Sequence, residues 1–179
     1  FAEAIDVATF EFENVPVASI EFLSERIPVH PGPKALATAQ DRLVEKIFLR
    51  DLGIPTAPYL ESNDATALGL AIAELQPPAV LKTARFGYDG KGQVLISADS
   101  NIEDAYQAMG AQRGVLEKWI DFKIEISVII ARRAAGTTAT FDPAENRHRN
   151  HILDTSIVPA RIPATVADKA KSMAARIAK

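Results

Sequence analysis

The sequence contains no cysteine, which excludes a disulfide framework, a cysteine-ligated zinc site and a thiol nucleophile. It has no apolar run that approaches the roughly 18 residues of a membrane-spanning helix. It also lacks an excess of one charge, because 20 Lys and Arg stand against 23 Asp and Glu, a net charge of −3. There is therefore no basic footprint for nucleic acid or an anionic membrane, and neither is expected as a partner.

Hydrophobic residues make up 47% of the 179 residues, and charged residues make up 24%. This balance predicts a folded core rather than disorder. The first residue is Phe1 instead of an initiating Met, and a helical pattern continues to the last residue, Lys179. We therefore expect the sequence to be a piece of a longer protein.

Apolar periodicity and turn residues predict a mixed fold. Helices are expected over residues 17–26, 34–52, 64–75, 100–109 and 165–179, and strands over 5–12, 79–83, 93–97, 114–120, 125–132, 137–141 and 152–156. Ser62 or Asn63 is expected to cap the third helix, and a polar loop is expected over 142–150. The strands between 80 and 156 are joined by turns too short for helical crossovers, so the prediction is an α+β or α/β fold with much antiparallel sheet.

A glycine-rich loop follows Lys82, with the sequence Phe-Gly-Tyr-Asp-Gly-Lys-Gly-Gln over residues 86–93. Glycines let backbone N–H groups approach phosphate oxygens, and a nearby lysine adds positive charge. The spacing matches neither a P-loop nor a Rossmann fingerprint. Asp-Gly between apolar runs is also an ordinary hairpin signal, and from the pattern alone the plain hairpin is the simpler interpretation.

A second candidate is the segment from Glu117 to Ile120, followed by Glu125. Its strand-edge backbone could pair with an adenine, and Glu125 could accept hydrogen bonds from ribose hydroxyls. An amphipathic strand with solvent-facing charges explains the same spacing. His148 and His151 with nearby carboxylates hint only faintly at a metal site, and a solvated polar loop is the favoured interpretation.

Five segments, in this order, carry a resemblance to a known family. They are residues 9–15 (Thr-Phe-Glu-Phe-Glu-Asn-Val), 39–43 (Ala-Gln-Asp-Arg-Leu), 52–58 (Leu-Gly-Ile-Pro-Thr-Ala-Pro), 81–83 (Leu-Lys-Thr) and 86–93. Together they resemble the N5-carboxyaminoimidazole ribonucleotide synthases, ATP-grasp enzymes of purine biosynthesis. The resemblance runs from about residue 5 to the end of the chain, and the glycine loop is its most specific part.

The resemblance implies an α+β ATP-grasp fold with the tail of an N-terminal α/β (pre-ATP-grasp) domain and a truncated C-terminal part. Residues 1–35 would end the N-terminal domain, and 36–60 would form a helical connector. Residues 61–117 would form the lid subdomain, and 118–179 would begin the larger ATP-grasp subdomain.

The implied activity is that of a carbon–nitrogen ligase. It would carboxylate 5-aminoimidazole ribonucleotide with bicarbonate through carboxyphosphate, using ATP and Mg²⁺, in a cytoplasmic homodimer. The family's ribonucleotide-phosphate turn would precede Phe1 and its magnesium-binding glutamates would follow Lys179. We therefore expect the chain as given to be incomplete for catalysis, with its metal ligands elsewhere.

The resemblance also implies a role for each matching residue. The nucleotide would be held by Arg42, Lys82, Gly87, Tyr88, Asp89, Gly90, Lys91, Gly92, Gln93, Glu117, Lys118, Trp119, Ile120, Glu125 and His148. Catalysis would use Lys82, Tyr88, Asp89 and Lys91, and the ribonucleotide would contact Glu13, Tyr88, Asp89 and Lys91.

Within that set, Arg42 and Lys82 would neutralise the phosphates under the closing loop, and Glu117 would face the exocyclic amine of adenine. Glu13 is preferred over Glu11 as the acid that faces the ribonucleotide. Lys91 departs from the arginine usual in the family.

Two other functions stay open. One is an ATP-grasp ligase with a different acceptor, such as the glycinamide ribonucleotide transformylase or a biotin-dependent carboxylase; Tyr88-Asp89 argues against it. The other is a non-catalytic binding module, which would show no thermal shift with magnesium-ADP.

Overall fold

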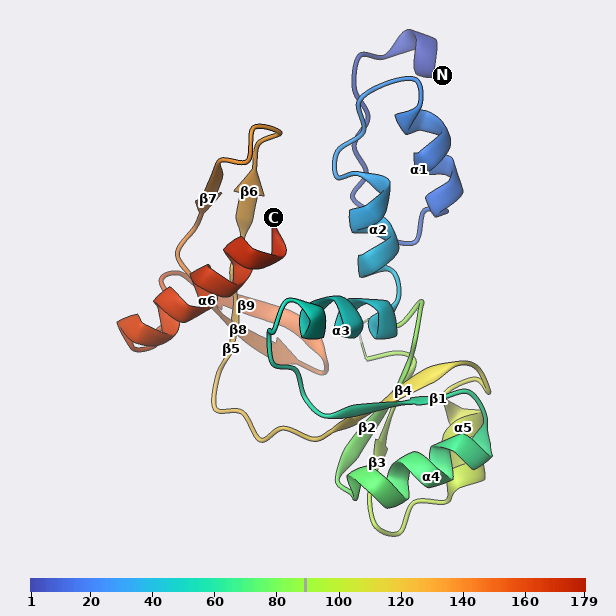
Figure 1. Cartoon of the computed structure of the whole chain (residues 1–179). Helices are drawn as coiled ribbons and strands as arrows, with labels where there is room; N and C mark the ends of the chain where they lie inside the picture. The colour runs from blue at the N-terminus through green and yellow to red at the C-terminus, as the bar shows by residue number, and fades with distance from the viewer. Residues whose placement is uncertain (89) are drawn as a thin grey trace. The chain divides into compact units, whose positions relative to one another are not determined.

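The computed structural model describes residues 1–88 and 90–179, so Asp89 lies outside the described residues. Contacts divide the chain into two compact units (Figure 1). Unit 1 consists of Phe1–Phe48 and Thr56–Trp119, and unit 2 consists of Leu49–Pro55 and Ile120–Lys179. In the described ranges, no helix combines the length and the apolar character needed to cross a membrane.

The N-terminal part of unit 1 holds a short 3-10 helix, η1 (Ala2–Ala4), and the predicted helix α1 (Val17–Ser24). The strand predicted over 5–12 is wrong, because only Ala8 forms a β-bridge, with Val29. Val29 stands between Pro28 and Pro31, which have no N–H to donate, so the ladder cannot extend.

The single helix predicted over 34–52 is two helices, α2 (Pro33–Ala39) and α3 (Arg42–Asp51). Asp41 separates them, because its carboxylate accepts from the amides of Leu43 at 2.9 Å and Val44 at 3.3 Å and so caps α3. Gly53 follows α3 with φ of +64°, in agreement with the predicted glycine stop.

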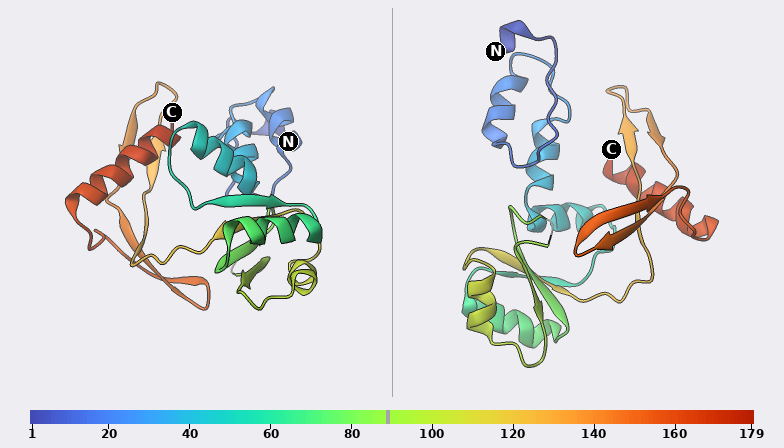
Figure 2. Two further views of the ribbon diagram at one scale, coloured as in Figure 1. Left: turned by 60° about the horizontal axis from the view of Figure 1, so that its bottom comes forward. Right: turned by 180° about the vertical axis from the view of Figure 1, so that it is seen from behind.

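Four antiparallel strands form the sheet of unit 1 in the order β1-β4-β2-β3. They are β1 (Tyr59–Ser62), β2 (Ala79–Thr83), β3 (Gln93–Ile96) and β4 (Gly114–Lys118). Two helices, α4 (Ala65–Leu75) and α5 (Ile102–Ala108), pack on one face, as the two views of Figure 2 also show. The N-cap of α4 is Asp64, which accepts from the Ala67 amide at 2.7 Å, so the prediction of Ser62 or Asn63 is wrong.

The two faces of this sheet differ because side chains alternate along each strand. Leu81 and Leu116 pair across β2 and β4 and are fully buried under α4 and α5. Their neighbours Lys82 and Glu117 therefore point to the opposite face. On that face Leu43 of α3 packs against Val115, Ala84 and Tyr59.

Unit 2 contains a three-stranded antiparallel sheet, β5-β8-β9, a separate hairpin of β6 and β7, and the helix α6 (Ala164–Ile177). The strands are β5 (Glu125–Ser127), β6 (Ile130–Arg132), β7 (Thr138–Thr140), β8 (Ala144–Arg149) and β9 (Ile152–Ile157). The strand predicted over 125–132 is thus divided between two sheets.

The polar loop predicted over 142–150 is wrong, because β8 occupies most of it. β8 is joined to β9 by Asn150 and His151, whose φ angles of 52° and 65° are both positive. A two-residue turn with two positive φ angles fits the right-handed twist of paired strands. The turn therefore favours pairing that the polar composition of the segment concealed.

Candidate functional site

Three charged side chains meet on the face of the unit 1 sheet opposite α4 and α5. The Nζ of Lys82 donates to Glu117 Oε2 at 3.0 Å, and the Nζ of Lys46 lies 3.3 Å from Glu117 Oε1. Sequence reasoning found Lys82 and Glu117 but missed Lys46. The available signal was its spacing, since Lys46 follows Arg42 by four residues on the same face of α3.

Arg42, the first residue of α3, contacts the chain where β2 ends. Its backbone amide donates to the Ala84 carbonyl at 2.9 Å, and its Nε donates to the Thr83 carbonyl at 3.2 Å. A Cβ added to Gly87 would lie 3.3 Å from the Arg42 Nη2. The structure therefore brings this guanidinium to the start of the glycine loop, as the phosphate-binding prediction requires.

The glycine loop joins β2 to β3 and closes tightly over Thr83. The Thr83 amide donates to the Gly92 carbonyl at 2.8 Å. A Cβ on Gly92, which has φ of +68°, would come within 2.6 Å of Thr83 Oγ1, and one on Gly87 would come within 3.0 Å. Both positions need glycine because the loop backbone approaches Thr83 closely.

Two of the predicted substrate-binding side chains contact each other in this loop. The Nζ of Lys91 donates to the Tyr88 hydroxyl at 3.1 Å and lies 4.7 Å from the centre of its ring. Tyr88 is exposed, so this pair is open to solvent. The third predicted residue, Asp89, is outside the described part of the chain.

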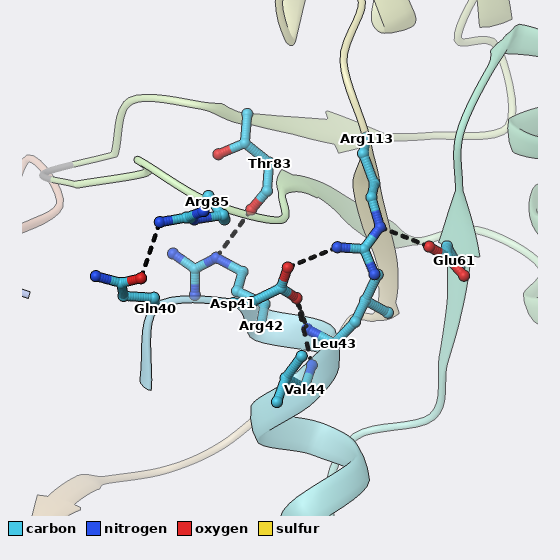
Figure 3. Close-up of polar contacts among 9 residues, drawn as sticks. All are labelled: Gln40, Asp41, Arg42, Leu43, Val44, Glu61, Thr83, Arg85 and Arg113. Atoms are coloured by element: carbon cyan, nitrogen blue, oxygen red, sulfur yellow. Dashed lines mark hydrogen bonds and ion pairs between the residues drawn. The ribbon is translucent and has the colours of Figure 1, made fainter. Parts of the chain in front are cut away.

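Gln40 links the segment of Glu13 to the base of the glycine loop. Its Nε2 donates to the backbone carbonyls of Glu13 and Val15, each at 2.5 Å. Its Oε1 accepts from Arg85 Nη2 at 2.9 Å, as Figure 3 shows. Gln40 is buried, and all three contacts tie residues 13–15 to the chain just before the loop. Gln40 belongs to the motif of residues 39–43, from which no role was predicted for it.

Asp41 and Arg113 complete the network drawn in Figure 3. The Nη1 of Arg113 donates to Asp41 Oδ2 at 2.5 Å, and its Nε donates to Glu61 Oε1 at 2.7 Å. The hydrogen bond that Arg113 donates to Glu61 and the contacts with Asp41 raise the pKa of Arg113 above its usual value, although burial acts in the opposite direction. The N-terminus of α3 is thereby fixed to β1 and to the residue preceding β4.

Glu45 belongs to the same charged surroundings. Desolvation raises the pKa of its carboxyl above the usual value, and the like charges of Glu117 and Glu13 act in the same direction. Arg42 and Lys46 oppose the shift. α3 thus contributes both acidic and basic groups to the surroundings of Glu117.

The segment after Glu117 has several of its polar groups already engaged. The Lys118 amide donates to the Pro58 carbonyl at 2.8 Å, and the Trp119 amide donates to the Pro78 carbonyl at 3.1 Å. The Lys118 ammonium donates to the carbonyls of Leu75 and Gln76 at the end of α4. These two amides and the ammonium therefore cannot donate to an adenine while they keep these partners. The predicted adenine contact by residues 117–120 needs other groups of the segment.

In unit 2, Glu125 of β5 and His148 of β8 are close to each other, with Nδ1 of the histidine 3.6 Å from Oε1 of the glutamate. Glu125 also lines an open pocket of about 480 Å³. The pocket is lined by Phe122, Lys123, Ile124, Glu125, Glu145, Asn146, Arg147 and Arg161. Two of the residues predicted in unit 2, Glu125 and His148, are thus brought together by strand pairing.

Glu145 forms the most strongly perturbed ion pair of this pocket. Arg161 donates to both of its oxygens, with Nε at 2.8 Å from Oε2, and Arg147 Nε adds a contact at 3.3 Å. The hydrogen bonds from Arg161 lower the pKa of Glu145 to about 2, although burial acts against the shift. Across residues 1–88 and 90–179, no group of three or more His, Asp or Glu side chains could hold a metal ion.

Comparison with known families agrees with this geometry. The family model of the ATP-grasp domain matches residues 47–179, and that of the ribonucleotide synthetase preATP-grasp domain matches residues 1–40. The chain belongs to the ATP-grasp family. The predicted fold class, an ATP-grasp fold preceded by the tail of a pre-ATP-grasp domain, is thereby confirmed.

Among similar proteins, the N5-carboxyaminoimidazole ribonucleotide synthase of Brucella melitensis is 43% identical over 178 residues, which are 98% of this chain and 49% of the relative. The ADP complex of an N5-carboxyaminoimidazole ribonucleotide synthetase matches with a TM-score of 0.94 and 41% identity, over 99% of this chain and 47% of that one. The Aspergillus clavatus synthase, solved with ADP and 5-aminoimidazole ribonucleotide, matches with a TM-score of 0.87 and 25% identity over 98% and 46%.

This ATP-grasp chain therefore spans about half the length of the relatives it matches. The resemblance recognised from its motifs is confirmed by relatives of that name. Residue roles within the chain rest on the geometry above and on the sequence motifs.

Proposed function

We propose that the chain is part of an N5-carboxyaminoimidazole ribonucleotide synthase, and that it holds ATP for the carboxylation of 5-aminoimidazole ribonucleotide in purine biosynthesis. The observation that carries this proposal is the Arg42 guanidinium at the start of a loop that needs glycine at positions 87 and 92, with Lys82 on the strand that leads into this loop. Cations under a close-fitting glycine backbone suit the phosphates of a nucleotide. The similarity to synthases solved with ADP, in one case together with the ribonucleotide, supports the choice of substrates.

The proposed reaction has two steps. An oxygen of bicarbonate attacks the γ-phosphorus of ATP, a P–O bond forms, and the bond to ADP breaks, which gives carboxyphosphate. The exocyclic amine of the ribonucleotide then forms a C–N bond with the carboxyl carbon, or with carbon dioxide released from it, as phosphate leaves and the amine loses a proton. Lys82 and Arg42 neutralise phosphate charge, which is the main demand of phosphoryl transfer.

The glycine loop would protect the intermediate. Carboxyphosphate is lost to water unless the site closes over it, so a loop between two strands that folds over the phosphates serves catalysis directly. Tyr88, Asp89 and Lys91, which belong to this loop, would contact the ribonucleotide. Glu13 would contact the same substrate from the segment that Gln40 holds.

The remaining predicted residues would bind the adenosine. We propose that Glu117 and the chain through Ile120 serve the base, and that Glu125 and His148 serve the ribose and its neighbourhood. Mg²⁺ is assigned no ligand among the described residues, because they contain no suitable cluster, and no step is routed through it. A homodimer in the cytoplasm is proposed from the resemblance alone.

The proposal is tested by binding of magnesium-ADP to the chain and to Lys82→Met. A ligand at about 100 times its Kd stabilises a protein by about 2.7 kcal/mol, so the unmodified chain should show a clear rise in Tm. Lys82→Met should lose most of that rise, while Glu117 keeps Lys46 as its partner and the fold is preserved. Lys34→Met, on α2, is the control and should retain the rise.

An unmodified chain without any thermal shift would support the non-catalytic binding module instead. The acceptor is tested in a protein that contains this chain together with the magnesium-binding segment. Phosphate release should depend on 5-aminoimidazole ribonucleotide and should not respond to glycinamide ribonucleotide. The reverse preference would assign the site to a transformylase.

A further inference from the structure

Glu117 is ion-paired with two lysines at once, and the two lysines are not equivalent. Lys46 on α3 is 3.3 Å from one carboxylate oxygen, and Lys82 on β2 is 3.0 Å from the other. The side chains of Glu117 and Lys46 are 12% and 11% exposed, whereas that of Lys82 is 26% exposed. The more exposed of the two lysine side chains is therefore the one on the strand that leads into the glycine loop.

A single lysine would be enough to neutralise Glu117. A carboxylate this enclosed requires a counter-ion, because an unpaired buried charge is strongly destabilising. Glu117 and its two lysines together carry one surplus positive charge, and Glu45 and Arg42 of α3 add one charge of each sign to their surroundings. That surplus charge is available to a second anion only if one lysine can leave Glu117 while the other stays paired with the carboxylate.

Lys46 has a second contact besides Glu117. Its Nζ lies 5.1 Å from the centre of the Tyr59 ring, a distance at which an ammonium is attracted to an aromatic face. Tyr59 and Glu117 are direct partners across β1 and β4, so the ring and the carboxylate flank Lys46 from adjacent strands. Lys82 is directly followed by Thr83, over which the glycine loop closes.

We propose that Lys46 is a positioning residue for the nucleotide phosphates: it is the permanent counter-ion of Glu117, so that Lys82 can turn from Glu117 to the phosphates while the buried carboxylate stays paired. This inference rests on the proposed function, because it requires an anionic nucleotide beneath the loop. Lys46 itself touches no substrate. It acts by staying paired with Glu117, so that the charge of Lys82 can pair with the phosphates.

The test is a double-mutant cycle read by the Kd for magnesium-ADP in titration calorimetry. Lys46→Met should raise this Kd by roughly tenfold or more, because Lys82 must then stay with Glu117. In a Glu117→Gln chain there is no buried charge to neutralise, so adding Lys46→Met should change the Kd by less than about twofold. Lys46→Arg should restore most of the affinity. Arg50→Met removes an exposed charge from the same helix and is the matched control.

A merely structural role for Lys46 predicts a different pattern. Loss of packing over Tyr59 would raise the Kd equally in the unmodified and the Glu117→Gln backgrounds, and that result would overturn the inference, as would a Lys46→Met chain with unchanged affinity. If Lys46→Met does not fold, Lys46→Gln takes its place in the same cycle, since its neutral amide is polar and can donate a hydrogen bond to Glu117. An unmodified chain that fails to bind ADP contradicts the proposed function itself, whereas binding that is insensitive to Lys46 contradicts this inference alone.

Discussion

The sheets of the two units are stabilised by different interactions. In unit 1 one face of the sheet is covered by α4 and α5, and Leu68, Leu81, Ile96 and Leu116 are completely buried there. In unit 2 every residue of β7 is exposed, and so is every residue of β9 except Ile157. The buried residue of β8 is Glu145, which is paired with Arg161. Unit 1 is thus organised by apolar burial, and the β8 region of unit 2 by a carboxylate and its guanidinium.

Truncation of a leucine should show the largest difference in stability between the sheets of the two units. Leu81→Ala removes a fully buried side chain from β2 and is expected to lower the free energy of unfolding by about 2–5 kcal/mol. Leu153→Ala is the matched change in β9, where the side chain is 52% exposed, and should cost less than about 0.5 kcal/mol. Urea unfolding measures both. Equal losses would show that the exposed face of β9 is packed in solution.

Neutralisation of Glu145 should change how the stability of unit 2 depends on pH. The folded-state pKa of about 2 lies below the ordinary value of 4.5, so the ion pair stabilises the fold above pH 4.5 and this contribution is lost as the pH falls toward 2. Glu145→Gln should therefore be less stable than the unmodified chain at neutral pH, and the difference should shrink between pH 4.5 and 2.

Amide NMR signals of β8 and β9, followed through an acid titration, provide the measurement. Asp154→Asn is the control, because this carboxylate lies in exposed β9 and, within residues 1–88 and 90–179, accepts from the Thr155 hydroxyl and forms no ion pair. A difference between Glu145→Gln and the unmodified chain that does not vary with pH would mean that Glu145 contributes by packing rather than by charge.

The same contrast explains which parts of the fold could be predicted. β2, α4 and β4 have apolar residues at regular spacing because one face of each is buried, and their positions agree with prediction to within two residues. β8 carries Asn, Arg and His on largely exposed positions, so apolar periodicity could not reveal it. The positive φ angles of Asn150 and His151 that favour its hairpin are not evident from residue types alone.

The candidate site shows a similar division. Lys82, Arg42 and the glycine loop could be found because motif and chemistry coincide in a short segment. Lys46 has only its four-residue spacing from Arg42 as a signal, and Gln40 only its place in a motif. Their roles depend on partners far away in the chain, Glu117 for the lysine and the carbonyl of Glu13 for the glutamine. Only the folded chain brings such partners within hydrogen-bonding distance.

A small change at Thr83 tests the remaining contrast between the units. Both oxygens of Glu145 have donors, whereas Thr83 Oγ1, in the part of the chain that the structure describes, is buried with no hydrogen-bond partner. Removal of an unsatisfied buried hydroxyl relieves its desolvation cost, so Thr83→Val should raise the free energy of unfolding by about 1 kcal/mol. Valine also keeps the branched shape at a strand position.

Thermal unfolding of the free chain, with Thr83→Ser as the matched variant, decides the point. Serine keeps the hydroxyl and loses the methyl group, so it should be less stable than the unmodified chain, while valine should be more stable. The same measurement with magnesium-ADP asks whether the hydroxyl gains a partner when nucleotide is bound. If it does, the stabilisation by ADP should be smaller for valine than for serine, because valine has no hydroxyl to form the new hydrogen bond. The loop glycines lie close to Thr83 Oγ1, so a rearranged loop backbone can supply the partner.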